Sequence, residues 1–434
     1  MRALLLILIA SSALGQGRFD RFNQRTDQGR STRGFEQSNY AFFEFAPTSG
    51  AGMGTACACT TPTGAKGETL TFTRAGDATC SKQGLATTGI ANGDLVVCTA
   101  NQPRVESSGG VLGLRVESAR TNSVLRSSEF DNAAWADDSN PVSAITITAN
   151  QATAPDGTVT AERFQIPART AAQWSLRRQA IAAGSTGSAS VYLKGNGTSG
   201  IVSLIADGAL ATCVDCAFNS STWTRCTLSA AGSWIFIGSA SGYGACAGGA
   251  RAAEDVFVWG AQTEGAGVAT YATSYIPTVA ATVTRNADAP TVSLGSGTWG
   301  CEAASFSVAG YNASGSNQRV LTLAVDASNL YDQYINFSGA SIQHFTFLAA
   351  TTRQHATSNA PAAALSVSRA AYRQNGTTLV TELDGTTTSS TPSAYTALTG
   401  TTTLHLGKYT SGGFELSGII SRIQVDPSPS RCTQ

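Results

Sequence analysis

Hydrophobic residues in this chain recur mainly at every second position, over short segments bounded by Gly, Asn, Asp or Pro. Alternation places apolar side chains on one face of a strand, because neighbouring side chains point to opposite faces. Segments 69–73 and 144–148 show it most clearly. Asn375-Gly376 and Asp384-Gly385 lie between extended residues and predict hairpin turns. Helical periodicity is almost absent, so the pattern predicts an all-β chain.

The strand signals fall into three groups along the chain. Residues 50–126 contain a few short strands, a β module too small to be stable alone without disulfides. Residues 127–288 and 289–434 each contain a longer series of strands with Gly-rich turns, which is typical of a β-sandwich. Residues 16–49 are polar and predict a flexible lead-in, whose aromatic residues at 40–45 are expected to add an edge strand to a later sheet. The predicted fold is therefore two tandem β-sandwiches with a small N-terminal β module.

Residues 1–15 have the pattern of a secretory signal peptide. Arg2 supplies a positive charge, Ala3–Ala10 form an apolar run, and the small residues Ala13 and Gly15 fit cleavage before Gln16. The run is too short to span a bilayer, and no later segment approaches about 18 uninterrupted apolar residues. A buried N-terminal strand or helix is the alternative. We expect a secreted, extracellular or cell-surface protein without a transmembrane segment, with the periplasm as the alternative compartment.

The 10 cysteines agree with export, because disulfides persist in oxidising compartments. They occur in even numbers within each part of the chain, which predicts disulfides local to each domain. Cys301 and Cys432 flank the last sandwich, so we expect a bond that ties its two ends. Zinc is the alternative for the middle group, although that group has irregular spacing and no nearby His. The first two groups are Cys57, Cys59, Cys80 and Cys98, and then Cys213, Cys216, Cys226 and Cys246.

Length and charge narrow the choice of partners. The chain has 434 residues, enough for two or three domains. Only 13% of them are charged and the formal net charge is zero, so the charge gives no reason to expect binding to nucleic acid or to an anionic membrane. An apolar fraction of 42% is sufficient for a packed core.

Two sets of matched passages bracket the first predicted sandwich and contain no catalytic constellation. The leading set reads T-F-T-R-A, A-N-Q-P-R and G-L-R-V-E-S-A-R-T-N, and the closing set reads W-G-A-Q-T-E, T-S-Y-I-P-T and V-T-R-N-A-D. The passages are Thr71–Ala75, Ala100–Arg104, Gly113–Asn122, Trp259–Glu264, Thr273–Thr278 and Val283–Asp288.

These passages resemble a module of bacteriophage tail and head-fibre proteins and of related bacterial surface proteins. In that family the passages enclose a jelly roll similar to a carbohydrate-binding module, and the resemblance covers roughly residues 69–288. The last part of the chain resembles a concanavalin A-like, laminin-G-type sandwich, through 373–376, 404–407 and 416–422. A signal peptide and 10 cysteines are unusual for phage fibres, which favours an exported bacterial protein built from the same modules.

Carbohydrate recognition needs exposed aromatic faces beside hydrogen-bonding groups, and several aromatic residues are candidates. Trp174 precedes two arginines and Tyr243 lies in a Gly/Ser-rich segment, so both are expected at the surface. Trp234 and Trp259 each share a strand face with a Phe, which predicts core packing for them, and Trp223 also reads as structural. The further candidates for ligand contact are Trp135, Tyr331 and Tyr409.

The sequence gives weaker support to a catalytic or metal site than to a carbohydrate-binding site. The three histidines have no nucleophile elbow beside them and read as structural or surface residues. Glycoside hydrolysis needs two carboxylates across a cleft, and Glu162 and the Glu254-Asp255 pair are the candidates. Asp255 is also the expected ligand of a structural calcium ion. The three histidines are His344, His355 and His405.

The sequence thus predicts an exported, non-catalytic protein that recognises a glycan or a cell-surface polysaccharide. The first alternative is a phage-derived structural or adhesive fibre component, which would form a homo-oligomer and, if phage-encoded, lie in the virion. The second alternative is a glycan hydrolase or lyase.

Overall fold

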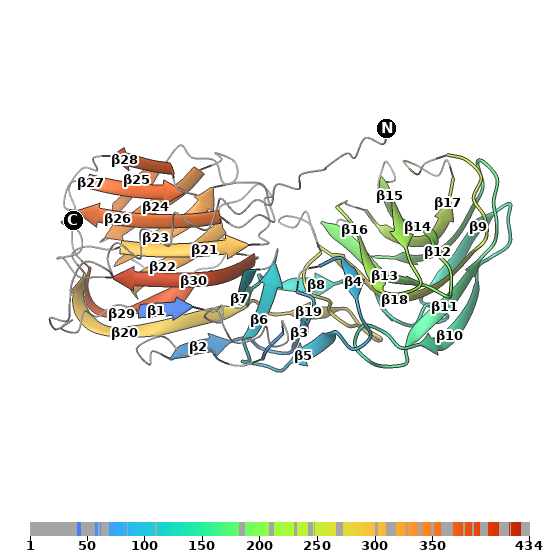
Figure 1. The fold of residues 1–434 in the computed structure, drawn as a ribbon, viewed down its shortest axis with the longest axis horizontal. Coiled ribbons are helices and arrows are strands. Elements are labelled where there is room, and N and C mark those ends of the chain that lie inside the picture. Colours follow the sequence, from blue (N-terminus) through green and yellow to red (C-terminus); the bar gives the residue numbers. More distant parts are fainter. Residues whose placement is uncertain are drawn as a thin grey trace, which may run out of the picture. The chain divides into compact units, whose positions relative to one another are not determined.

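In the computed structural model the chain divides into two compact units, Met1–Asn39 and Tyr40–Gln434. Every regular element of the described residues is a strand, which confirms the predicted all-β class (Figure 1). None of those residues belongs to a helix long and apolar enough to cross a membrane. The predicted signal peptide lies outside the described residues. These are 41–44, 57–59, 61, 69–84, 86–108, 111–181, 187–207, 212–229, 232–241, 246, 248–265, 272–299, 303–309, 318–326, 329–336, 341–348, 351–356, 368–375, 378–383, 386–390, 398–407, 416 and 418–426.

The first sandwich consists of two antiparallel sheets. The larger sheet has the strand order β10-β11-β18-β13-β16-β4, with β8 beside β18 and β19 beside β8. Its strands are β4 (Thr88–Ile90), β8 (Arg120–Asn122), β10 (Thr146–Ala152), β11 (Ala161–Ile166), β13 (Ser188–Gly195), β16 (Trp223–Leu228), β18 (Glu254–Glu264) and β19 (Val283–Arg285).

The smaller sheet of this sandwich has the order β15-β14-β17-β12-β9. Its side chains alternate as a two-faced sheet requires: Ile235 and Ile237 of β17 join the core between the sheets, while Phe236 points the other way into a separate cluster. The core is closed from the larger sheet by residues such as Phe164 and Val258. The strands are β9 (Ala136–Asn140), β12 (Trp174–Ala180), β14 (Gly200–Asp207), β15 (Thr212–Phe218) and β17 (Trp234–Ala240).

The C-terminal part of the chain forms two further antiparallel sheets. One has the order β2-β20-β29-β22-β23-β24-β25, and the other β28-β27-β26-β21-β30-β7-β6 with β1 beside β30. β26 pairs with β27 up to Asn375 opposite Thr378, and β27 pairs with β28 up to Leu383 opposite Thr386, so both predicted hairpins are confirmed. The strands are β20 (Ala289–Trp299), β21 (Ala303–Ala309), β22 (Gln318–Asp326), β23 (Asn329–Asn336), β24 (Ser341–Leu348), β25 (Thr351–Ala356), β26 (Ser368–Asn375), β27 (Thr378–Leu383), β28 (Thr386–Ser390), β29 (Leu398–Leu406) and β30 (Gly418–Asp426).

The N-terminal module gives most of its strands to sheets built from later parts of the chain. β2 (Leu70–Thr73) pairs with β20, β7 (Val111–Val116) pairs with β30, and β4 pairs with β16. β1 (Ala41–Glu44) also pairs with β30, which confirms the predicted edge strand. β6 (Arg104–Ser108) extends β7, and β3 (Ala78–Ser81) with β5 (Leu95–Cys98) forms a two-stranded sheet. The domain boundaries at 126 and 288 stay a prediction.

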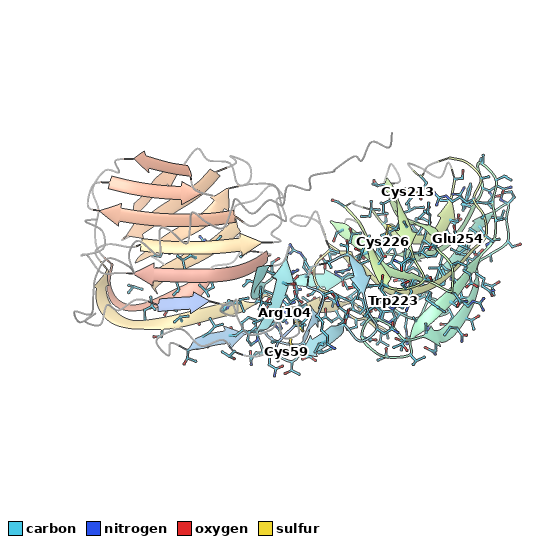
Figure 2. The ribbon with its side chains drawn as sticks, viewed as in Figure 1. Cys59, Arg104, Cys213, Trp223, Cys226 and Glu254 are labelled. Atoms are coloured by element: carbon cyan, nitrogen blue, oxygen red, sulfur yellow. A yellow bond between two sulfur atoms is a disulfide. The ribbon has the colours of Figure 1, made fainter. Side chains whose placement is uncertain are left out.

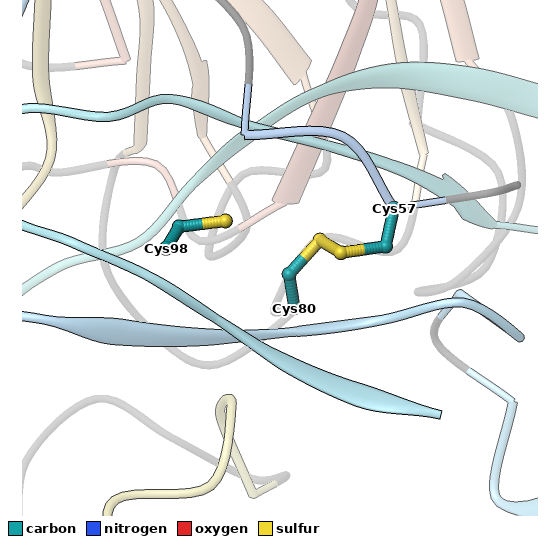
Figure 3. Close-up of side chains that lie close together, drawn as sticks. All are labelled: Cys57, Cys80 and Cys98. Atoms are coloured by element: carbon teal, nitrogen blue, oxygen red, sulfur yellow. A yellow bond between two sulfur atoms is a disulfide. The ribbon is translucent and has the colours of Figure 1, made fainter. Parts of the chain in front are cut away.

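Eight of the cysteines form four disulfides, each local to its part of the chain as predicted. Two lie in the N-terminal module, where the sulfurs of Cys57, Cys80 and Cys98 come within 4.8 Å of one another (Figure 3). The middle sulfurs are engaged in disulfides, so the zinc alternative is wrong for them. Cys301 and Cys432 lie outside the described residues. The bonds are Cys57–Cys80, Cys59–Cys98, Cys213–Cys246 and Cys216–Cys226.

Removal of a disulfide is expected to cost more stability when the bond closes a longer loop. The Cys59–Cys98 bond spans 39 residues and the Cys216–Cys226 bond spans 10. From chain entropy, replacing both cysteines by Ala lowers the free energy of unfolding by about 4 kcal/mol for the first and about 3 kcal/mol for the second. Urea titrations of the two double variants measure the difference, and a larger loss for the shorter loop would contradict the prediction.

Candidate functional site

The matched passages converge on one buried cluster of charged side chains. Arg104, on β6, joins both sets: Nη1 donates to Glu117 Oε2 at 2.7 Å, and Nη2 donates to Asp288 Oδ2 at 2.5 Å (Figure 2). Arg74 Nη1 donates to Asp288 Oδ1 at 3.1 Å. All of these side chains are completely buried. The passages bracketing the first sandwich are therefore in direct contact in the fold.

Glu117 is the centre of this cluster, which we call the charge cluster. Arg115 and Arg285 also donate to its carboxylate, and Ser274 Oγ donates to Oε2 at 2.6 Å. Burial alone disfavours ionisation, but Arg115, Arg285 and Arg104 together outweigh it and hold the pKa of Glu117 well below its usual value. Glu117 is thus ionised in a cluster where four arginines surround two carboxylates, and Arg115 also pairs with Glu106. We define it as Arg74, Arg104, Arg115, Glu117, Arg285 and Asp288.

A second contact between the two sets passes through Asn122. Its side-chain amide donates to Ile276 O at 2.8 Å and to Ala261 O at 3.2 Å, and its side-chain oxygen accepts from Thr263 N at 3.0 Å. Asn122 therefore supplies the hydrogen bonds that backbone groups of two separate segments, β18 and the segment at Ile276, require. The charge cluster and Asn122 are both inaccessible, which indicates that the motif residues hold the fold rather than contact a ligand.

Surface aromatic residues gather on the smaller sheet of the first sandwich, on the face that points away from the core. We call it the outer face. Trp174 on β12 and Trp234 on β17 are half-buried there, and both pack on a cluster that includes Leu176 and Phe236. Trp174 pairs with Ala240, six residues from Trp234 on the same strand, so the backbone positions of the two tryptophans are about 20 Å apart along the sheet, and their side chains lie closer together.

Charged side chains fix both tryptophans. Asp138 on β9 accepts from Trp174 Nε1 at 3.1 Å and from Arg178 Nη1 at 3.1 Å. The guanidinium of Arg178 in turn lies over the Trp234 ring, 4.7 Å from its centroid. Asp138 and Arg178 thus connect the two aromatic positions and place polar groups between them. Such an arrangement offers apolar surface and hydrogen-bonding groups side by side.

The segment between β17 and β18 is fastened to this outer face. Arg169 donates to Gly249 O at 2.8 Å and to Ser239 Oγ at 2.7 Å, and the Cys213–Cys246 disulfide ties the segment to β15. Arg251 pairs with Asp215 on the same side. These contacts fix the part of the face beside the tryptophans.

The candidate ligand contacts from the sequence have different positions in the fold. Trp174 lies on the outer face, and Tyr331 lies in β23, opposite Leu323 of β22. Trp135 is a core residue: it is 2% exposed, packs on Phe130 at 4.8 Å and donates its indole N–H to Arg126 O at 3.1 Å, so its ring cannot contact a ligand. Tyr243 and Tyr409 lie outside the described residues.

The sequence predicted that Trp234 packs in a core on the same strand face as Phe236. Trp234 does pack against a buried hydrophobic cluster that contains Phe236, but this cluster lies on the outer face, and Trp234 itself is half-buried. Trp223 and Trp259, 0% and 2% exposed, are core residues as predicted.

The predicted calcium ligand Asp255 is engaged in an ion pair. Arg163 donates to Oδ1 at 2.8 Å and to Oδ2 at 2.5 Å, and Asn196 donates to Oδ2 at 3.2 Å. These hydrogen bonds, that of Arg163 foremost, lower the pKa of Asp255. A calcium ion would have to displace Arg163, and calcium binding stays a prediction.

Glu162, one of the carboxylates considered for catalysis, is 1% exposed in the first sandwich. Burial, reinforced by the neighbouring carboxyl of Asp131, raises the pKa of Glu162 to about 8. The other two candidates, Glu254 and Asp255, lie at the start of β18. Glu254 accepts from Ile201 N at 3.3 Å, and burial raises its pKa.

The histidines are all on strands of the C-terminal part. His344 and His355 lie opposite each other in the β24–β25 register. His405 lies in β29, where partial burial lowers its pKa.

Comparison with known proteins does not assign this chain to a family. No protein-family model and no curated protein sequence matches the chain. Among solved structures, domains LG4-5 of the mouse laminin alpha1 chain are similar at 11% sequence identity, over 74% of this chain and 92% of that one, with a TM-score of 0.24. A score this low does not extend to function. The resemblance to fibre modules stays a prediction.

Removing one member of the charge cluster is expected to destabilise the protein strongly. Glu117→Gln leaves three arginines without their common carboxylate, so the free energy of unfolding should fall by about 3–5 kcal/mol. Glu129→Gln is the matched control, because Glu129 pairs with Arg126 at the surface and should cost less than about 1 kcal/mol. Urea titration compares them, and equal losses would show that the cluster contributes no more than a surface pair.

The protonated form of Glu162 is expected to stabilise the fold at low pH. Its folded pKa of about 8 exceeds the reference value of 4.5, so this contribution is fully present below about pH 4.5 and is lost as pH rises towards 8. Relative to Glu162→Gln, the wild-type free energy of unfolding should therefore fall across that interval. Urea titrations at several pH values measure it, with Glu129→Gln as the control, and a constant difference between wild type and Glu162→Gln would contradict the assignment.

Proposed function

We propose that this chain is an exported, non-catalytic protein that binds carbohydrate at the cell surface or outside the cell, through the outer face of its first sandwich. The observation that carries the proposal is the pair of half-buried tryptophans, Trp174 and Trp234, joined by Asp138 and Arg178. Sugar rings present apolar C–H faces and a rim of hydroxyl groups. Indole rings beside charged hydrogen-bonding groups complement both.

The rigidity of the outer face supports the same proposal. Binding costs less when the contacting side chains are already held in place. Asp138 holds the Trp174 indole, Arg178 covers Trp234, and the Cys213–Cys246 bond anchors the adjacent segment. Trp174 and Trp234 lie at opposite ends of two paired strands, about 20 Å apart along the backbone, which favours an extended chain of sugars over a single one.

The carboxylates favour binding over hydrolysis. A pair of catalytic acids must face one cleft, about 5–9.5 Å apart. Glu162 is buried in the sandwich, while Asp255 is occupied by Arg163. On the outer face, Asp138 and Asp215 are each engaged by an arginine. These engagements support a non-catalytic role.

A structural or adhesive fibre is the second candidate. The observation that favours it is strand exchange between successive parts of the chain, in which β2 and β7 complete sheets of the C-terminal part. Continuous sheets resist separation of their parts, which suits a load-bearing component. Homo-oligomers that do not bind glycans would favour this candidate, and a saturable glycan interaction would favour the first.

Truncation of either outer-face tryptophan is expected to weaken glycan binding about tenfold or more, as for buried aromatic anchors at other interfaces. The variants are Trp174→Ala and Trp234→Ala, tested on arrays of bacterial and plant glycans with and without calcium. Phe257→Ala is the matched control, because Phe257 is a partly buried aromatic residue on β18 of the other sheet. Silence of the oxidised wild-type protein across the array would reject the carbohydrate proposal.

A further inference from the structure

A cavity of about 150 Å³ lies where strands of the N-terminal module meet the larger sheet of the first sandwich. Its lining comes from β3, β5 and β6 on one side, and from β13 and β16 on the other. Direct hydrogen bonds hold the two sides together: Thr79 Oγ1 donates to Tyr275 O at 2.8 Å, and Arg225 N donates to Thr87 O at 2.5 Å. The cavity is distinct from the outer face, which belongs to the other sheet.

Three polar side chains that line this cavity each retain a buried atom without a hydrogen-bond partner. The atoms are Ser81 Oγ, Glu106 Oε2 and Arg225 Nε. Ser81 and Glu106 are 8% and 2% exposed. A buried polar atom without a partner is costly, and native proteins rarely keep several together unless a water molecule or a ligand satisfies them.

Other contacts fix two of these side chains, those of Glu106 and Arg225. Glu106 Oε1 accepts from Ser81 N at 2.7 Å, while Arg225 donates to Thr273 O at 2.7 Å and to Ser190 Oγ at 3.0 Å. Arg225 also lies over the Tyr192 ring, 5.2 Å from its centroid. Reorientation of Glu106 or Arg225 would break an existing contact, so their unused atoms are preorganised.

The remaining lining is largely apolar. Ile90, Leu95, Tyr192 and Tyr275 contribute to it, and the two tyrosine rings meet edge to face with centroids 6.2 Å apart. A volume of about 150 Å³ is enough for one six-membered ring, as the benzene-binding cavity of similar volume in another protein illustrates. The cavity therefore combines the volume of a single ring with apolar walls and a few polar atoms.

Hydrogen-bonding capacity and charge select the class of ligand. Glu106 Oε2 forms an ion pair with Arg115 Nη1 at 3.6 Å but accepts no hydrogen bond, whereas Arg225 Nε requires an acceptor. A hydroxyl group can serve as donor or acceptor, so a ring that carries several hydroxyls can satisfy both. Because Arg115 already balances Glu106, a neutral ring fits this poorly solvated space better than an anion, which would lose its own hydration.

From these observations we infer that the cavity is a second binding site, which takes one uncharged, polyhydroxylated six-membered ring such as a neutral monosaccharide or a cyclitol. Ala86 and Thr87 line it and are exposed, so they mark its mouth. The inference does not rest on the outer face, because the two sites share no residue.

The test is titration of the oxidised full-length protein with a panel of neutral monosaccharides, cyclitols and uronic acids, followed by calorimetry and by ligand-observed NMR. We expect one neutral ring to bind saturably at one site per chain. Ala86→Trp, which blocks the mouth from an exposed position, should weaken this binding at least tenfold. Ser81→Ala, which removes one hydrogen-bonding hydroxyl, should weaken it about 3- to 10-fold.

Two matched variants keep the test specific. Ala91→Trp adds the same bulk at an exposed position that does not line the cavity, and it should bind as the wild type does. Trp174→Ala should also leave this binding unchanged, which separates the cavity from the outer face. The inference is overturned if no panel member binds saturably, if Ala86→Trp binds normally, or if only uronic acids bind.

Discussion

The buried carboxylate of Glu117 is the constraint on which the arrangement of this protein depends. A charge this far from water is tolerable only when several opposite charges and hydrogen bonds surround it. Arg104, Arg115 and Arg285 meet that requirement, and they come from β6, β7 and β19. Since β6 and β7 belong to a sheet of the C-terminal part and β19 to the first sandwich, the carboxylate connects two sheets. Ion pairs of this kind contribute less to net stability than to specificity, because any other pairing leaves a charge uncompensated.

Strand positions could be predicted from sequence where alternation was regular and where Asn-Gly or Asp-Gly marked a turn. Alternation also placed Phe236 and Trp234 on the same face. It could not say whether that face was the core or the surface, because the sheet carries apolar residues on both faces. The strands β9 and β15 show no clear alternation, because polar residues such as Asp137 and Asp215 interrupt it.

Some of the functional residues could be predicted from the sequence and others could not. Trp174 was found because adjacent arginines indicated the surface, and one of them, Arg178, does contact the second tryptophan of the outer face. The structural role of the matched passages could not be predicted from their spacing, because their charged residues lie far apart along the chain and come into contact only in the fold. The cavity had no sequence signal, because Ser81, Glu106 and Arg225 come from three strands with nothing in common but their final position.

The charge cluster has a consequence for the order in which a chain synthesised from its N-terminus acquires structure. The pairs Cys57–Cys80 and Cys59–Cys98 can close as soon as the first hundred or so residues are available, because both partners of each bond lie in that stretch. Glu117 acquires its partners in two stages: Arg104 and Arg115 precede it in the chain, but Arg285 and Asp288 arrive only after the whole first sandwich has been made. Until then its carboxylate is incompletely surrounded and stays hydrated, so the N-terminal module can be cross-linked before its interior excludes water.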